Sequence, residues 1–372
     1  ETMETMRTRL ISCFNCPMTC GATISPPGKP TYMMKCFTKL TYTLGAMSDL
    51  EFGLGIAQSA TEYGVDGFSA PQVMAFALEL YEDGILTDKD LPDLPEDNEG
   101  RFYYLLDKIV RREGIGDVLA NGTYWAAKEI GNGAEEYAHN NIRKAEQLPL
   151  KLGMLNQMYF LMYCTGEKAN ITQIEGNFPQ VPFFTREERE DFCKDWVHVP
   201  DDRFKKWFVD WELRGENSIP NYPDIDASCE IVNWQEMLHY VDDSTGMCAG
   251  LSSFPYKPPF HIHNLPELIS SGAGLDLDKE GLEHLTARNR NLVRANNFRH
   301  GMTAEDEKPP ADHWKKRFPN FEDKILKAYY KFKGWNTDGI PTRETLHDLD
   351  LDYVAEDFIK RGILKDSEGS AS

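Results

Sequence analysis

Residues 69–86, SAPQVMAFALELYEDGIL, carry the pattern that decides the fold class of this chain. The apolar side chains of this stretch recur every three or four residues, at Val73, Phe76, Ala77 and Leu80. That spacing is typical of one face of an α-helix. Ser69 is a residue type that begins helices, and Gly84 is one that ends them. The stretch therefore predicts an amphipathic helix that buries one face.

Other segments repeat the helical pattern. The apolar positions with this spacing are Phe102, Leu105, Leu106, Ile109 and Val110; Trp234, Met237, Leu238 and Val241; and Leu282, Leu285, Leu292 and Val293. We expect the first of these helices to end at Gly114 and residues 116–131 to continue after a short turn. Proline-rich and acidic stretches separate the helical segments. The chain is therefore predicted to be mainly α, with helices packed against helices.

Composition indicates a large, acidic globular protein. The 372 residues suffice for two ordinary domains, and 41% of them are apolar, which is enough for sizeable cores. The formal net charge of -20 disfavours binding to nucleic acid or to an anionic membrane surface, because both need a positive field. The sequence contains no apolar run long enough to span a membrane, and its first residues lack the pattern of a secretory signal. We therefore expect a cytoplasmic protein without membrane insertion.

Three cysteines lie close together in ISCFNCPMTCGA, residues 11–22. Cys13, Cys16 and Cys20 form a C-x-x-C-x-x-x-C array, which lacks the fourth ligand that a tetrahedral zinc site or a four-iron cluster requires. The spacing alone fits either metal site. Eight cysteines in a large acidic chain without a signal favour metal ligands and buried thiols over a disulfide framework.

A distant cysteine, Cys248, follows a polar turn at the end of a predicted helix. The turn reads D-x-x-G-M-C, in which Asp243 offers an acceptor carboxylate and Gly246 allows close approach to the backbone. A polar heterocycle with N–H donors could dock there. The alternative is purely structural: Asp243 and Ser244 cap the helix end, and Gly246 is its terminal glycine.

Six stretches together resemble a known enzyme family. They are ISCFNCPMTCG, GVDGFSAPQVMAFALELYEDGIL, VRREGIGDVLANGTYWAAKEIG, VDDSTGMC, NNFRHGMTAEDEKPP and YYKFKGWNTDGIPTRETL. They resemble the second and third domains of tungsten-dependent aldehyde:ferredoxin oxidoreductases, which bind one tungsten through two pterin dithiolenes beside a four-iron cluster. The resemblance implies two helical domains, residues 1–145 and 146–372. It begins near residue 1, so we expect the family's N-terminal, pterin-supporting β domain to be absent from this chain.

The resemblance also implies which residues hold the cofactors. The matches to the 4Fe-4S cluster ligands are Cys13, Cys16, Cys20 and Cys248. The matches to the two pterin-binding turns are Gly64 and Asp66 in the first turn and Asp243, Gly246 and Met247 in the second. Thr61 replaces the leading aspartate of the first turn, so we expect that pterin contact to be altered but kept.

Two departures from the family pattern concern ligands and acids. Gly55 and Gln58 replace the glutamate and histidine of the family's dimer-bridging iron site, and neither is a strong iron ligand. We therefore expect any homo-oligomer to lack a bridging iron. Thr31 and Met33 replace acidic residues of the aldehyde-oxidising members, and neither can act as a general acid or base at neutral pH.

Cys36 is a cysteine that the cluster does not need. A soft thiolate suits a tungsten already bound by sulfur, and the alternative is burial as a small hydrophobe, which we expect for Cys164, Cys193 and Cys229. One branch of the family, the tungsten benzoyl-coenzyme A reductases, is similar in losing the glutamate and presenting a cysteine to the metal.

The leading interpretation is therefore reduction of the aromatic ring of benzoyl-CoA to a cyclic diene. The resemblance implies a tungsten bis-pterin, a 4Fe-4S cluster and electrons from an iron-sulfur partner subunit. Proton donors are not visible in the sequence. Two other interpretations remain open: an aldehyde or carboxylic acid oxidoreductase of the same family, and, more distantly, a noncatalytic interaction protein stabilised by zinc on the same four cysteines.

Overall fold

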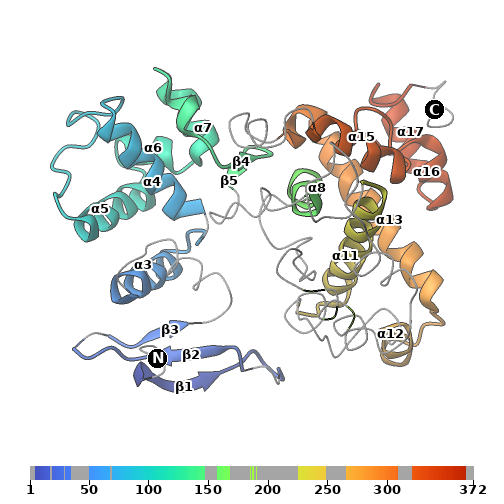
Figure 1. The fold of residues 1–372 in the computed structure, drawn as a ribbon, viewed down its shortest axis with the longest axis horizontal. Coiled ribbons are helices and arrows are strands. Elements are labelled where there is room, and N and C mark those ends of the chain that lie inside the picture. The colour runs from blue at the N-terminus through green and yellow to red at the C-terminus, as the bar shows by residue number, and fades with distance from the viewer. Residues whose placement is uncertain are drawn as a thin grey trace. The chain divides into compact units, whose positions relative to one another are not determined.

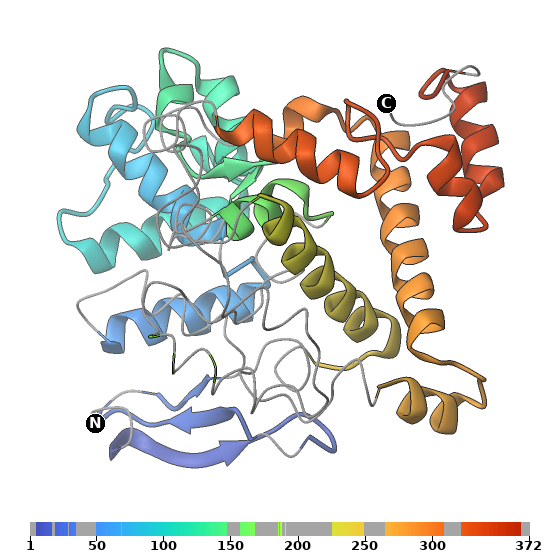
Figure 2. The same ribbon diagram turned by 45° about the vertical axis from the view of Figure 1, so that its right-hand side comes forward.

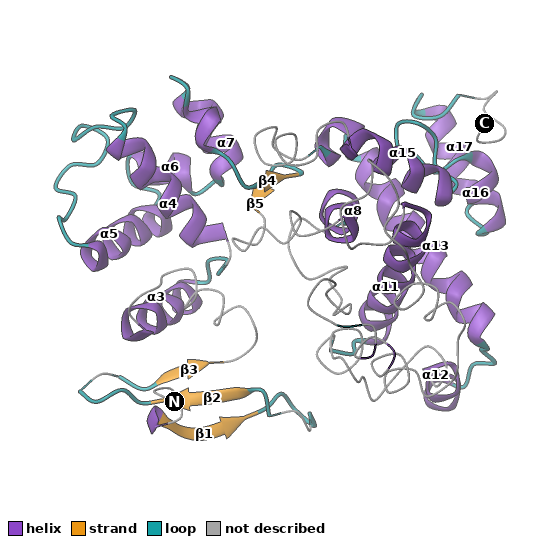
Figure 3. Cartoon of the chain, in the orientation of Figure 1, coloured by secondary structure: helices purple, strands orange, loops and turns teal. Residues whose placement is uncertain are grey.

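A computed structural model describes residues 5–16, 19–28, 30–34, 50–67, 69–146, 157–167, 185, 187, 190, 225–248, 265–308 and 321–365. The chain divides into two compact units, Glu1–Leu150 and Lys151–Ser372. Helices dominate the described residues, and short strands occur in the first unit (Figure 3). The predicted mainly α fold class is therefore confirmed.

The first unit begins with a small antiparallel sheet that the sequence patterns did not predict. Its strands are β1 (Arg7–Ile11), β2 (Gly21–Ile24) and β3 (Tyr32–Met34), in the order β1-β2-β3 (Figure 1). Ile11 pairs with Gly21 at the end of the β1–β2 ladder. The segment between these two residues carries the cysteine array, so the sheet fixes both ends of the array.

A helical core follows the sheet in the first unit. Its helices are α3 (Leu50–Tyr63), α4 (Ser69–Glu82), α5 (Asn98–Arg111), α6 (Ile115–Leu119) and α7 (Thr123–Ile130), followed by η1 (Ala134–Tyr137) and the hairpin β4 (Asn141–Ile142) and β5 (Ala145–Glu146). The predicted apolar face of α4 is buried at all four positions named above. Gly84 has φ 75°, as expected of the glycine that ends α4.

The predicted end of α5 is wrong by two residues. Arg112, not Gly114, adopts the left-handed conformation that ends the helix, with φ 54°. The backbone N–H of Glu113 then donates to Lys108 O at 3.1 Å. Gly114 instead precedes α6 as its N-cap. A non-glycine residue ends α5 because the following turn is held by its own hydrogen bonds.

The second unit is built around one long helix, α11 (Ile225–Thr245), which packs against α8 (Gln157–Thr165), α13 (Lys279–Arg299) and α15 (Phe321–Phe332). The remaining elements are α12 (Leu265–Ala273), η4 (Ala304–Glu307), α16 (Arg343–Asp348) and α17 (Asp352–Lys360). Most of α11 is buried, including the predicted apolar positions. Figures 1 and 2 show α11 and α13 side by side in this unit.

The predicted helix at α13 forms, but its predicted apolar face is wrong. Leu282 is buried, whereas Leu285, Leu292 and Val293 are 36–40% exposed. The buried face carries polar and charged residues instead, Thr286, Arg290, Asn291 and Arg294 among them. The hydrophobic pattern therefore predicted the wrong buried face of α13, because carboxylates from other segments pair with the arginines that are buried there.

None of the helices in the described ranges combines the length and the apolar character that crossing a bilayer requires.

Candidate functional site

The cysteine array occupies the loop between β1 and β2. Cys13 and Cys20 are exposed, Cys16 is partly buried, and all three thiols are free. The backbone N–H of Cys16 donates to Cys13 O at 3.1 Å, which closes a tight turn around Asn15 at φ 54°. The turn thus brings the backbones of Cys13 and Cys16 close together.

The side chain between these two cysteines is unusually accessible. Phe14 is 94% exposed on the described surface. A fully exposed aromatic ring is unfavourable in water. The cysteine loop therefore combines three thiols that the sequence predicts to be metal ligands with an exposed apolar side chain.

A second turn lies at the end of α11, and we refer to residues 243–248, which are the last three residues of α11 and the three after it, as the second cofactor turn. Gly246 adopts φ 71°, and the backbone N–H of Met247 donates to Asp242 O at 3.0 Å. These features are those of a helix ending in a left-handed glycine, so the structural role suggested for Gly246 is met. Among the described residues, no atom lies within 4 Å of a Cβ placed on Gly246, and Cys248 is exposed, so the described part of the chain leaves this turn accessible.

Residues 61–66, the first cofactor turn, have the same backbone arrangement. Gly64 adopts φ 73°, and the backbone N–H of Val65 donates to Ala60 O at 3.0 Å. Among the described residues, a Cβ placed on Gly64 would likewise meet no atom within 4 Å. Asp66 Oδ1 accepts from the Ser69 backbone N–H at 2.7 Å, so this carboxylate also caps α4. The two turns predicted from the resemblance are thus structural equivalents, one in each unit.

The positions of the family's bridging iron site are closed in this chain. Gly55 is buried, and a side chain there would lie 2.7 Å from Tyr103 Oη and 3.8 Å from Tyr32 Oη. Gln58 Nε2 donates to Glu62 Oε1 at 2.8 Å. Within the described ranges, no group of three His, Cys, Asp or Glu side chains is arranged to hold a single metal ion.

A buried ionic network in the second unit was missed by the sequence analysis. Its cations are Arg290, Arg294 and Lys333, and its carboxylates are Glu167, Glu236 and Glu307. Each of these side chains is at most 7% exposed. Three cations face three carboxylates, so the network is formally neutral. A buried charge is tolerated only with such pairing.

Arg294 holds one end of this network. Its guanidinium donates to Glu167 Oε1 at 2.9 Å, to Glu307 Oε1 at 2.8 Å and to Gly339 O at 2.6 Å. It also lies 3.7 Å from the ring centroid of Trp335, a close cation–π contact. The Tyr330 hydroxyl also donates a hydrogen bond to Glu307, so this buried carboxylate accepts from both Arg294 and Tyr330.

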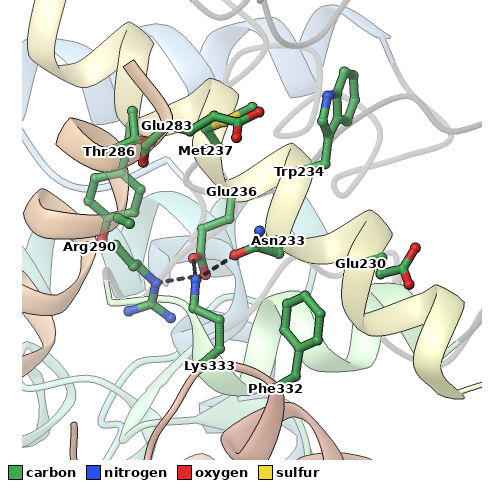
Figure 4. A pocket seen from close by; sticks show the side chains of 12 residues that line it. Glu230, Asn233, Trp234, Glu236, Met237, Glu283, Thr286, Arg290, Phe332 and Lys333 are labelled. Atoms are coloured by element: carbon green, nitrogen blue, oxygen red, sulfur yellow. Dashed lines mark hydrogen bonds and ion pairs between the residues drawn. The ribbon is translucent and has the colours of Figure 1, made fainter. Parts of the chain in front are cut away.

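Lys333 and Glu236 form the other end, beside a small cavity of about 170 Å³ (Figure 4). Lys333 Nζ donates to Glu236 Oε1 at 2.7 Å and to Asn233 Oδ1 at 2.6 Å. Burial opposes the ionisation of Glu236, but Arg290 and Lys333 outweigh it and lower the pKa of this carboxyl. For Lys333, burial is the main effect, and it lowers the pKa. The two hydrogen bonds that Lys333 donates are nevertheless those of an ammonium group.

Several predicted residues lie outside the described part of the chain. Cys36 and Cys193 are among them. Cys164 and Cys229 are buried, which confirms their predicted packing role.

Comparison with known proteins assigns the family. Residues 1–351 match the model of aldehyde ferredoxin oxidoreductase, domains 2 and 3. The chain belongs to the aldehyde ferredoxin oxidoreductase family. The resemblance inferred from the motifs is therefore confirmed.

Individual relatives agree with this family. The tungsten-containing aldehyde ferredoxin oxidoreductase of Pyrococcus furiosus is 24% identical over 368 residues, covering 91% of this chain and 52% of that protein. The corresponding protein of Pyrococcus abyssi is 25% identical over 374 residues, covering 93% of this chain and 53% of that protein. The chain thus spans about half the length of the curated relatives that it matches.

A solved structure is much more similar. It is described as the active site complex BamBC of benzoyl coenzyme A reductase in complex with 1,5-dienoyl-CoA. The match has a TM-score of 0.91 and 68% sequence identity, and it covers 99% of this chain and 56% of that chain. Within the family, the chain therefore resembles a benzoyl-CoA reductase far more than it resembles the Pyrococcus enzymes.

Proposed function

We propose that this chain forms the cluster-binding and pterin-binding part of a tungsten enzyme that reduces the aromatic ring of benzoyl-CoA to a cyclic dienoyl-CoA. The observation that carries this proposal is the 68% identity, over 99% of the chain, to a benzoyl-CoA reductase complex. Aldehyde-oxidising relatives reach only 24–25% identity over a similar share of the chain. The electron donor would be an iron-sulfur partner subunit.

The cysteines fit an iron-sulfur cluster. Cys13, Cys16, Cys20 and Cys248 are the proposed 4Fe-4S ligands, and each thiol is free and at least partly accessible. Thiolates are the ligands that such clusters use, and each binds a separate iron, so the four sulfur atoms need not converge on one point. The buried cysteines of the same described segments are unsuited to this role.

The two cofactor turns fit the pterins. Gly64 and Gly246 carry no side chain, and the described residues place no atom within 4 Å of a Cβ there, so a planar heterocycle would be able to approach the backbone. Asp66 and Asp243 would accept hydrogen bonds from its amino and ring N–H groups, and Met247 would add an apolar contact. When bound, the tungsten pterin supplies the redox chemistry at the substrate, and the cluster supplies electron transfer.

The residues of this chain would also keep the reaction selective. Cys36 is proposed as a further thiolate ligand of the tungsten, which would raise electron density at the metal. Thr31, whose Oγ1 lies 2.8 Å from Ser25 Oγ, and Met33 offer no ionisable group at the positions of the family's acids. A site poor in protons and water favours ring reduction over reduction of protons.

Metal and substrate analysis test this proposal together. The full-length protein, purified without oxygen with its electron-donating partner, should contain tungsten and iron. It should form a dienoyl-CoA from benzoyl-CoA and a strong reductant. Turnover of simple aldehydes with a viologen dye, without turnover of benzoyl-CoA, would instead identify an aldehyde oxidoreductase. Zinc as the sole metal would refute both enzymatic proposals.

The role of Cys36 has a separate test. Cys36→Ser should change the electron paramagnetic resonance of the tungsten centre, because one soft ligand is replaced by a hard one. Cys164→Ser is the matched control, since Cys164 is a buried thiol. Equal spectra for both variants would mean that Cys36 only packs.

A further inference from the structure

One guanidinium in the second unit connects three separate segments. Arg290, on α13, donates through Nη1 to the Glu167 carboxylate and through Nη2 to Thr165 O at 2.7 Å, at the end of α8. Its Nε lies 2.6 Å from Glu236 Oε2, on α11. The side chain is only 2% exposed. Arg290 therefore fixes α11 relative to both α8 and α13.

The contact on α11 lies two helical turns before the second cofactor turn. Glu236 precedes Asp243 by seven residues, which is about 10 Å along a helix. Glu236 is held from α15 as well, because the Tyr329 hydroxyl donates to Glu236 Oε2 at 3.1 Å. The axial position and rotation of the last turns of α11 are thus set by this carboxylate.

The neighbouring residue on α13 reaches the turn itself. Asn289 Nδ2 donates to Ser244 Oγ at 2.9 Å, and Ser244 Oγ donates to Tyr240 O at 2.6 Å. Ser244 directly follows Asp243 in the chain. Two adjacent residues of α13 therefore hold the end of α11 at two levels, one buried and one partly exposed.

Stability alone does not explain this arrangement. Replacing buried ion pairs by well-packed apolar residues is often neutral or stabilising. Apolar side chains form no directional hydrogen bonds, so they cannot fix α8, α11 and α13 relative to one another from one planar group. Arginine has donors on three nitrogens in a rigid fork, whereas lysine has one nitrogen.

We infer that Arg290 and Asn289 are positioning residues for the second cofactor turn. They hold the end of α11 so that Asp243, Gly246 and Cys248 present their groups in one arrangement before any cofactor binds. Preorganisation of this kind strengthens binding because the ordering has already taken place on folding. The inference rests on the proposed function, since it requires a cofactor at this turn.

Two matched lysine variants of the full-length protein test the inference. Arg290→Lys removes the bridge to α11. Arg294→Lys is an equally buried change one turn along the same helix, but Arg294 hydrogen-bonds to Glu167, Glu307 and Gly339, none of which lies on α11. Both variants should unfold at lower temperature than the wild type. Only Arg290→Lys should lose tungsten and pterin, by about tenfold after gel filtration, and alter the resonance spectrum of the tungsten centre.

Asn289→Ala extends the test to a variant that leaves the buried network intact. Its control is Asn296→Ala, at an exposed position of the same helix. Asn289→Ala should lower tungsten retention about fivefold, since one hydrogen bond is lost, and Asn296→Ala should not. This pair decides the inference if the arginine variants fail to fold.

The outcomes separate the inference from the proposed function. Equal tungsten and pterin contents in Arg290→Lys and Arg294→Lys, or in Asn289→Ala and Asn296→Ala, would overturn the positioning role while the enzyme assignment stands. A wild-type protein that lacks tungsten would overturn the proposed function itself.

Discussion

Accessibility at the level of single residues separates the cysteines by role. Among the described cysteines, Cys164 and Cys229 are buried, whereas Cys13, Cys16, Cys20 and Cys248 are at least partly accessible. A metal reaches an accessible thiolate, and a buried thiol packs as a small hydrophobe. The four cysteines proposed as cluster ligands are therefore the ones that the structure leaves able to bind metal.

Two serine substitutions, one in α11 and one just after it, should affect different properties: iron content and stability. Cys248→Ser should lose most of the cluster iron, because a hydroxyl is a poor ligand for the cluster. Cys229→Ser should keep the iron but lower the free energy of unfolding by about 1–3 kcal/mol, since a buried hydroxyl costs more to desolvate than a buried thiol. Iron analysis and denaturant unfolding of both variants measure this, and unchanged iron in Cys248→Ser would exclude it as a ligand.

The motifs identified the cysteines and the glycine turns, but not the partners of the buried charges. Arg290 binds Glu167, which lies 123 positions earlier in the chain, and Glu236. No local spacing predicts such a pairing. Isolated charges usually face solvent, so nothing in the sequence marks Arg290 and Arg294, two of the four arginines of α13, as buried.

At the level of elements, a glycine allows two helices to approach each other closely. Gly116, in α6, lies against the end of α5, and a side chain there would sit 2.2 Å from Lys108 O. At Gly272, in α12, a side chain would meet no atom of the described residues within 4 Å. Both glycines belong to helices, so a difference between substitutions at the two positions reports packing rather than helix propensity.

Alanine substitutions at these glycines should therefore change stability in opposite directions. Gly116→Ala should lower the free energy of unfolding by about 1–3 kcal/mol or more, because backbone has to move. Gly272→Ala should raise it by about 0.5–1 kcal/mol through helix propensity. Chemical unfolding of the intact chain measures both, and equal shifts would contradict the close approach of α6 to α5.

A histidine in the last turn of α16 should respond to pH. His347 Nδ1 lies 2.9 Å from Asp352 Oδ1, and this hydrogen bond, with the negative charge of Asp352, raises the pKa of His347 above its usual value. The contribution to stability is then fully present below the unfolded pKa of about 6.5 and is lost as pH rises through the folded pKa. Titration of His347 by nuclear magnetic resonance measures this pKa.

Asp352→Asn is the control for that titration. The substitution removes the charge, so the pKa of His347 should fall back toward its ordinary value. A titration that is the same in both proteins would mean that the contact contributes nothing in solution.

At the level of the whole molecule, the proposed cofactor residues are shared between the two units. Cys13, Cys16 and Cys20, with the first cofactor turn, belong to one unit, and Cys248, with the second cofactor turn, belongs to the other. A ligand that binds only the folded chain stabilises it. Bound cofactors should therefore make the two units unfold together.

Removal of the metals should separate their unfolding. Scanning calorimetry of the full-length protein as isolated should give a more cooperative transition than the metal-free protein. Binding at 100 times the dissociation constant contributes about 2.7 kcal/mol, so the metal-free protein should melt about 5–10 °C lower. Identical transitions before and after metal removal would argue against a cofactor with ligands from both units.

The sequence by itself determined the helical class, the cysteine array, the two glycine turns and the family, because each depends on residues that are close in the chain. Only the tertiary structure decided which face of α13 is buried, how Tyr103 closes the position beside Gly55, and which carboxylates neutralise Arg290. The physical reason is that burial of a charge depends on partners brought together from distant segments. The hydrophobic pattern of one helix contains no information about those partners.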